Sequence, residues 1–147
     1  MALSADYPLW APMEGTGLFE VIGQSNASLT FYRGALAHIA LGTGKLVVSN
    51  ANAEQFSGIV TKQVVTGAAD VPVSHLVTGV VWIGGCANMA LANIGKTVAA
   101  AAGNDSPSAI KATAVGDPGA IGRLLYIDVE GASGYVDLNQ RSLVVNA

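Results

Sequence analysis

Short apolar runs alternate with turns rich in glycine, asparagine and aspartate along most of the chain. Glycine accepts a positive φ without a Cβ clash, so runs bounded by such turns are typical of the short strands of sandwiches and small barrels. We expect a strand in each run that fits this description. The predicted strands are residues 18–22, 28–33, 35–40, 45–48, 57–65, 76–83, 97–101, 109–113, 122–129 and 135–138.

So many short strands predict a mainly β fold, with residues 18–147 forming a single compact β-sandwich or barrel domain of antiparallel strands. A chain of 147 residues is long enough for one such domain and too short for a second. At most one or two short helices are expected, in the apolar segment 87–92 and the alanine-rich segment 98–102. The second segment overlaps a predicted strand. Neither repeats its polar positions at the helical period over enough residues to form an amphipathic helix.

Residues 1–17 differ from the rest of the chain because large apolar side chains are crowded around two prolines. Proline has no N–H and disfavours helix, so this segment is predicted to be an extended N-terminal arm. Such an arm can cover the core of its own domain or lie across a neighbouring molecule, where its side chains would fill pockets. Both arrangements stay open, and the contact with a neighbour is the one we favour. The arm residues expected to make it are Tyr7, Leu9, Trp10, Pro12 and Met13.

The composition indicates a protein that assembles with other chains. Hydrophobic residues make up 51% of the sequence and charged residues 12%, against about a quarter charged in ordinary soluble domains. So few charges leave apolar surface exposed, and such surface usually marks contacts with other chains. No apolar run approaches the ~20 residues of a spanning helix, so no membrane contact is expected. The N-terminus lacks the pattern of a secretory signal, so synthesis and use inside a cell are the default.

The charged and titratable residues predict no catalytic, cofactor or metal site. Lysines and arginines are scattered singly, and a net charge of −3 argues against direct nucleic-acid binding. Cys86 has no neighbouring base or cation, so a buried, inert thiol is expected. His38 is expected to be hydrogen-bonded or at the rim of the core, and His75 to lie in a turn. Neither histidine has a second ligand at metal-binding spacing.

Residues 90–97 fit the loose form of a phosphate-binding loop, and the apolar run 124–128 ends in an aspartate that could hold its magnesium. Such a loop needs a glycine-rich interior that lets successive N–H groups surround the phosphates. Here Leu91 and Ile94 would crowd it, and no long helix follows Lys96. A P-loop-like NTPase is therefore disfavoured.

Six glycine-containing segments occur in an order and spacing that resemble the head decoration, or cement, proteins of tailed bacteriophages. The similarity covers roughly residues 18–140. The segments that carry it are residues 31–37, 42–47, 56–60, 95–98, 119–124 and 134–138.

This resemblance implies a small β-rich structural protein without a reaction or a cofactor. Proteins of this family dock on the outside of an expanded capsid, where subunits of the major capsid protein meet, and stabilise the shell against the packaged DNA. They assemble as homotrimers more often than dimers, are made in the host cytoplasm and end on the capsid exterior of the virion. An N-terminal arm commonly reaches along the shell, which implies that Tyr7, Leu9, Trp10 and Met13 anchor it.

Two other classes stay open beside the decoration protein. One is a different β-rich virion protein of a tail or sheath. The other is a small β-sandwich module that binds a ligand such as a glycan, which would need an exposed aromatic platform. The sequence disfavours the glycan module because Trp10 lies in the arm, Trp82 lies in the run 80–83, which is expected to be buried, and aromatic residues total 6%.

Overall fold

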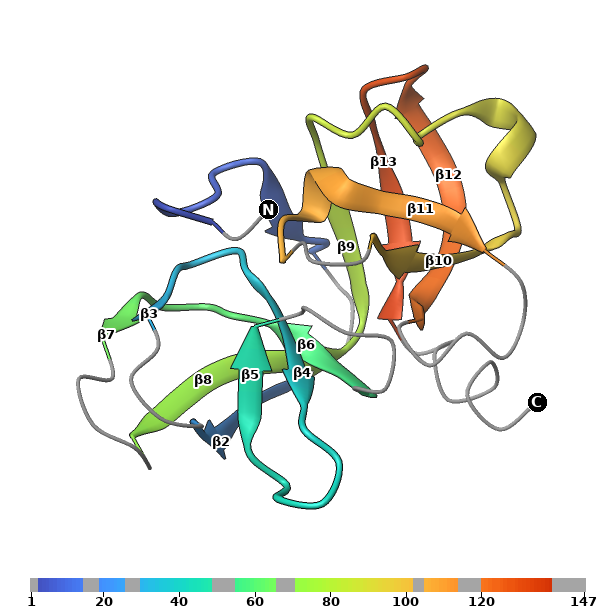
Figure 1. Cartoon of the computed structure of the whole chain (residues 1–147). Helices are drawn as coiled ribbons and strands as arrows, with labels where there is room; N and C mark the ends of the chain where they lie inside the picture. The colour runs from blue at the N-terminus through green and yellow to red at the C-terminus, as the bar shows by residue number, and fades with distance from the viewer. Residues whose placement is uncertain are drawn as a thin grey trace.

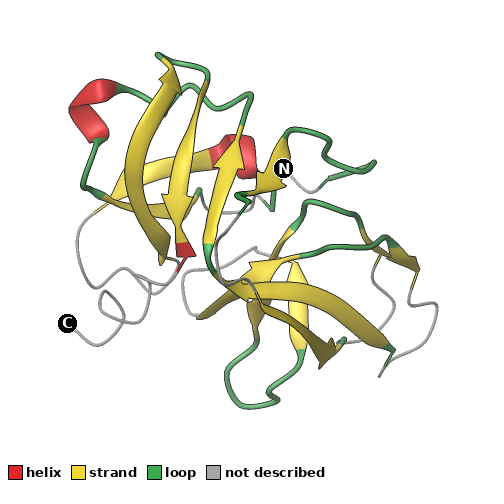
Figure 2. Ribbon diagram, turned by 180° about the vertical axis from the view of Figure 1, so that it is seen from behind, coloured by secondary structure: helices red, strands yellow, loops and turns green. Residues whose placement is uncertain are grey.

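A computed structural model describes residues 3–14, 19–25, 30–48, 55–65, 71–101, 105–113 and 120–138. The prediction of a mainly β fold is confirmed, because paired antiparallel strands dominate these residues. The helical pieces among them are two 3-10 turns, η1 at Leu91–Asn93 and η2 at Pro107–Ala109. The strands form two lobes that lie side by side (Figure 1), and the view from behind shows the same division (Figure 2).

The first lobe, here called the large-sheet lobe, is one antiparallel sheet with the strand order β1-β9-β13-β12-β10-β11. Its strands alternate apolar residues that face the core with residues that face outward, as in β9, where Val81 and Ile83 are fully buried. The strands are β1 (Trp10–Pro12), β9 (Val80–Ile83), β10 (Thr97–Ala100), β11 (Ile110–Thr113), β12 (Ala120–Val129) and β13 (Ser133–Asp137).

The second lobe, here called the small-sheet lobe, contains three smaller sheets. The pairs are β2 with β8 and β3 with β7, and the third sheet has the order β5-β4-β6. Its strands are β2 (Phe19–Gln24), β3 (Thr30–Phe31), β4 (Leu36–Ile39), β5 (Leu46–Val48), β6 (Gln55–Ile59), β7 (Val64–Val65) and β8 (Pro72–Thr78).

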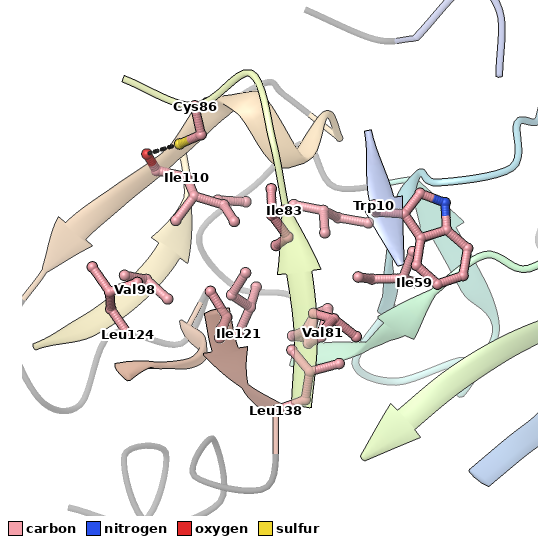
Figure 3. Close-up of a cluster of buried hydrophobic side chains, with 14 of the residues drawn as sticks. Trp10, Ile59, Val81, Ile83, Cys86, Val98, Ile110, Ile121, Leu124 and Leu138 are labelled. Carbon is pink, nitrogen blue, oxygen red and sulfur yellow. Dashed lines mark hydrogen bonds between the residues drawn. The ribbon is translucent and has the colours of Figure 1, made fainter. Parts of the chain in front are cut away.

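The main hydrophobic core joins the two lobes. Ile59 of β6 and Trp10 of the arm pack in one cluster with Val81 and Ile83 of β9 (Figure 3). The same cluster extends to Leu124 of β12 in the large sheet. A second cluster lies inside the small-sheet lobe and consists of Phe31, Ala35, Ala37, Leu46, Val60 and Val73. The small-sheet lobe thus has a core of its own, and the main cluster joins it to the arm and to the large-sheet lobe.

Three predicted elements are placed differently by the structure. The predicted strand 76–83 is divided at Gly79, whose φ of 106° lets the chain leave β8 in one lobe and enter β9 in the other. The predicted strand 57–65 is likewise divided between β6 and β7. A helix at 98–102 is wrong, since residues through Ala100 form the fully buried strand β10. Pairing with β11 and β12 overrides the helix propensity of its alanines.

The expectation for His75 is wrong, and His38 lies inside the core instead of at its rim, while the expected burial of Cys86 is confirmed. His75 lies within β8 and not in a turn. His38 is fully buried edge-on against Phe56, and neither of its ring nitrogens has a hydrogen-bond partner among the described residues. Burial lowers the pKa of His38 to about 4. Cys86 is fully buried, its thiol donates to the carbonyl oxygen of Ile110 (Figure 3), and burial raises its pKa.

Candidate functional site

The N-terminal arm docks on its own chain. Its strand β1 forms the edge of the large sheet, where Trp10 lies opposite Ile83 of β9. Backbone hydrogen bonds extend this pairing on both sides, because Gly84 N–H donates to the Leu9 carbonyl and Met13 N–H donates to the Val80 carbonyl. The arm therefore covers its own domain in this structure.

Before β1, the arm spans the junction of the two lobes. Tyr7 N–H donates to the Arg33 carbonyl in the small-sheet lobe at 2.7 Å, and the Tyr7 hydroxyl donates to the Gly84 carbonyl in the large-sheet lobe at 2.6 Å. Burial raises the pKa of Tyr7, so the hydroxyl keeps the proton that it donates. Leu3 N–H donates to Oδ1 of the buried Asp105 at 2.7 Å. These bonds tie the arm to both lobes.

Arg33 and Gly34 lie against Tyr7 and Trp10 of the arm, and the pair is here called the seat of the arm. The guanidinium carbon of Arg33 lies 5.4 Å from the centroid of the Trp10 ring, in reach of a cation–π interaction. Gly34 has a φ of 89°, and a Cβ at this position would lie 2.6 Å from the Tyr7 carbonyl oxygen and 2.9 Å from Trp10 Cδ1. In the sequence this seat is marked only by an Arg-Gly pair that follows two aromatic residues. The sequence alone does not show that the arm packs against this pair.

The five predicted arm residues end in different environments. Trp10 is 7% exposed and belongs to the main core, and its Nε1 has no hydrogen-bond partner among the described residues. Tyr7 and Met13 are half-buried, while Leu9 and Pro12 are exposed. Contact of these residues with a capsid or a neighbouring molecule stays a prediction, and in the structure Leu9 and Pro12 have the most surface left for it.

Three aliphatic side chains on separate elements of the small-sheet lobe are largely exposed, and this set is here called the apolar edge. It consists of Ile22 on β2, Leu41 in the β4–β5 turn and Val65 on β7, which are 71%, 67% and 68% exposed. Within the described residues, β2 pairs with β8 along one side, and its other side has no strand partner before the bridge of Ser25 to Leu46. An open strand edge with apolar side chains is a ready site for another chain.

The outer face of the large sheet carries an aromatic row that the sequence did not reveal. Trp82 lies opposite Tyr135, and Tyr135 lies opposite Tyr126, so the three residues are neighbours on three adjacent strands. Trp82 and Tyr135 are half-buried, and Tyr126 is 68% exposed. The period-two alternation of 80–83 was the signal, because it places Trp82 on the face opposite the buried Val81 and Ile83. The expectation of a buried Trp82 is wrong.

The segment that resembles a phosphate-binding loop is a closed turn. The amide of Leu91 donates to Glu130 Oε2, and those of residues 93–96 donate to carbonyl oxygens of the protein. Lys96 Nζ donates to Asn93 Oδ1 at 3.2 Å, and the chain then enters strand β10 instead of a helix. These amides are already bonded and cannot surround a phosphate group.

A serine–histidine contact lies inside the small-sheet lobe. Ser57 Oγ and His75 Nε2 are 2.7 Å apart, and His75 Nδ1 lies 3.3 Å from the Val73 carbonyl oxygen. The contact links β6 to β8. Because both side chains are almost wholly buried, a substrate cannot reach them. No cluster of three or more possible metal ligands occurs in the described ranges.

No protein-family model matches this chain, and no curated protein matches it either. Among the helical pieces that the structure describes, none has the length and apolar character of a membrane span.

Proposed function

We propose that this protein is a decoration protein that binds the outside of a phage capsid and stabilises the shell against packaged DNA. The order and spacing of the glycine-containing segments support this function, as does a chain in which charged residues are only 12%. The mainly β architecture of short strands is compatible with it. In this proposal the major capsid protein and other copies of the chain are the partners, with a homotrimer favoured over a dimer.

The observation that carries the proposal is the apolar edge. Full burial of an aliphatic side chain of this size contributes roughly 1.5–3 kcal/mol, so each of Ile22, Leu41 and Val65 that a partner covers would strengthen its attachment. Many identical copies on one shell would add these modest contributions. A surface with few charges also avoids the desolvation penalty of several kcal/mol for each unpaired ion that close packing would bury.

The test is the retention of purified protein on expanded capsids that lack it. We expect wild-type protein to cosediment with the shells and to raise the temperature at which they release DNA. The triple variant Ile22→Ser, Leu41→Ser, Val65→Ser should lose cosedimentation, because it removes the apolar side chains without touching the core.

The matched control changes exposed aliphatic residues on the other lobe. Leu91→Ser with Ile94→Ser alters side chains that are 64% and 42% exposed near η1 and should leave retention unchanged. Circular dichroism checks that both variants are folded. If wild-type protein ignores the shells, or if the control loses binding as fully as the triple variant, the proposal fails.

A further inference from the structure

A shallow groove lies on the outer face of the large sheet, beside the aromatic row. Its volume of about 420 Å³ falls within the range of pockets that hold small ligands. One wall comes from the end of the arm and the other from β12, with β9 and β13 between them. Its lining is apolar apart from one carboxylate and two phenolic hydroxyls. The lining residues are Met13, Glu14, Val80, Leu125, Tyr126 and Tyr135.

A hydrogen bond between the arm and β9 holds one wall, and a β-bulge in β12 forms the other. Met13 is fixed by the hydrogen bond from its N–H to the Val80 carbonyl at 3.1 Å. On the other side, the pairing of β12 with β13 shifts register between Leu124 and Tyr126, so Leu125 is an extra residue in β12. Such a bulge redirects the side chains next to it. Leu124 remains in the core, while Leu125 and Tyr126 line the groove.

The aromatic row extends the groove across the sheet. Neighbouring strands are about 4.8 Å apart, and Trp82, Tyr135 and Tyr126 occupy paired positions on three of them, so the three residues follow one another across the sheet. The Trp82 indole is held by its Nε1–H, which donates to Asp128 Oδ2 at 3.0 Å. A Cβ at Gly84 would lie 2.6 Å from Trp82 Cη2, so the glycine makes room for the ring. The Trp82 ring is thus fixed before a ligand arrives, which lowers the entropic cost of binding.

We propose that this groove and the aromatic row bind a neutral oligosaccharide. Aromatic rings offer flat apolar surfaces that fit the C–H faces of sugar rings, and their spacing on adjacent strands suits consecutive sugar units. The Glu14 carboxylate and the hydroxyls of Tyr126 and Tyr135 provide hydrogen-bond partners for sugar hydroxyls. A few polar groups in an apolar, aromatic pocket are the usual means of orienting a small ligand.

The charges and the backbone argue for this ligand over others. Glu14 lines the groove and Asp128 lies beside Trp82, so an anionic ligand would be repelled. The backbone groups of β9 and β13 are used in the sheet, so a peptide could not add a strand on this face. A lysine-rich peptide would need a cluster of carboxylates, whereas Glu14 is the single charged residue among those that line the groove.

The site is separate from the surface used in the proposed function. The apolar edge belongs to the small-sheet lobe, while the residues that line the groove belong to the large sheet and to the arm residues that follow β1. Figure 1 shows the two lobes side by side. The two activities can therefore be tested independently, and the failure of one says nothing about the other.

The test is calorimetric titration of the whole protein with neutral hexasaccharides of glucose, mannose, galactose and N-acetylglucosamine. At least one should bind, and Tyr126→Ala and Tyr135→Ala should each weaken it tenfold or more. Glu14→Gln keeps the shape of the wall and should weaken binding a few-fold. Tyr32→Ala, in the small-sheet lobe, is the control and should leave the affinity unchanged.

Three results would overturn the inference. One is the absence of binding to every hexasaccharide at millimolar concentration. Another is sugar binding that Tyr126→Ala and Tyr135→Ala leave intact in folded protein. The third is binding of a hexalysine peptide in place of the sugars, with loss of that binding in Glu14→Gln. Because Tyr126 is largely exposed, its substitution should not disturb folding, and thermal unfolding of each variant checks this.

Discussion

The two lobes are built from similar short strands, yet they bury different side chains. The large-sheet lobe places its strands in one sheet with an apolar inner face. The small-sheet lobe divides its strands among three sheets and buries both histidines of the chain, His38 and His75, together with Ser57. Buried polar groups need partners or are destabilising. The part of the pH sensitivity of folding that comes from His38 therefore resides in the small-sheet lobe, whereas the main apolar core is shared by both lobes.

The sharpest way to break the small-sheet lobe is at Gly58. A Cβ there would overlap the backbone carbonyl oxygen of Leu76, where β6 and β8 approach most closely. Since backbone atoms cannot move away as a flexible side chain can, Gly58→Ala should destabilise the fold by about 4 kcal/mol or more. We expect little soluble protein and a urea midpoint far below that of wild type.

A matched change in the other lobe is Gly122→Ala, where a Cβ would meet the Asp137 carbonyl oxygen. This clash is less severe and should destabilise the protein less than Gly58→Ala. A Gly58→Ala protein with the stability of wild type would show that β6 and β8 are not in close contact.

The junction of the lobes can be tested at Trp10. Removing its side chain leaves a cavity beside Ile59 and Ile83 and should lower the free energy of unfolding by about 3 to 5 kcal/mol. Urea unfolding of Trp10→Ala measures this effect, and Leu9→Ala, at an exposed position of the same arm, should cost well under half as much. Equal losses in the two variants would mean that the arm does not dock as the structure shows.

The smallest effect concerns the pH dependence contributed by His38. Its pKa falls from 6.5 to about 4 on folding, so below pH 6.5 the unfolded chain binds a proton that the folded chain does not. Stability should therefore decrease as pH falls from 6.5 toward 4, by about 2 to 3 kcal/mol at pH 4.5. Replacing the imidazole by leucine should remove this part of the decrease.

The measurement is urea unfolding of wild type and His38→Leu at pH 7 and pH 4.5. His75 is common to both proteins, so the difference between them isolates His38. Parallel pH profiles in the two proteins would show that His38 is protonated equally in the folded and unfolded states.

Local patterning was enough to predict most strands but not where they turn from one lobe to the other. The apolar run through residue 79 looks continuous, and the positive φ of Gly79 that divides it depends on the packing of two sheets. The alanines of β10 illustrate the same limit, because strand partners far along the chain override their helix propensity.

The candidate site was harder to predict than the fold for a related reason. Proline and aromatic content identified the arm, but its seat at Arg33 and Gly34 is a contact between distant parts of the sequence. The groove depends on a register shift in β12, which brings Leu125 and Tyr126 to the same side as Tyr135. A bulge of this kind leaves no mark in the alternation of apolar and polar residues.

The position of Cys86 has a practical consequence for all of these measurements. The only thiol of the chain is fully buried and its pKa is raised, so little thiolate is available to react with a maleimide in the folded state. A cysteine introduced at an exposed position outside the apolar edge, such as Leu91, would then be labelled selectively, without first removing the native one. Fluorescent dyes can thus report attachment to a shell while the interior of the protein keeps its natural composition.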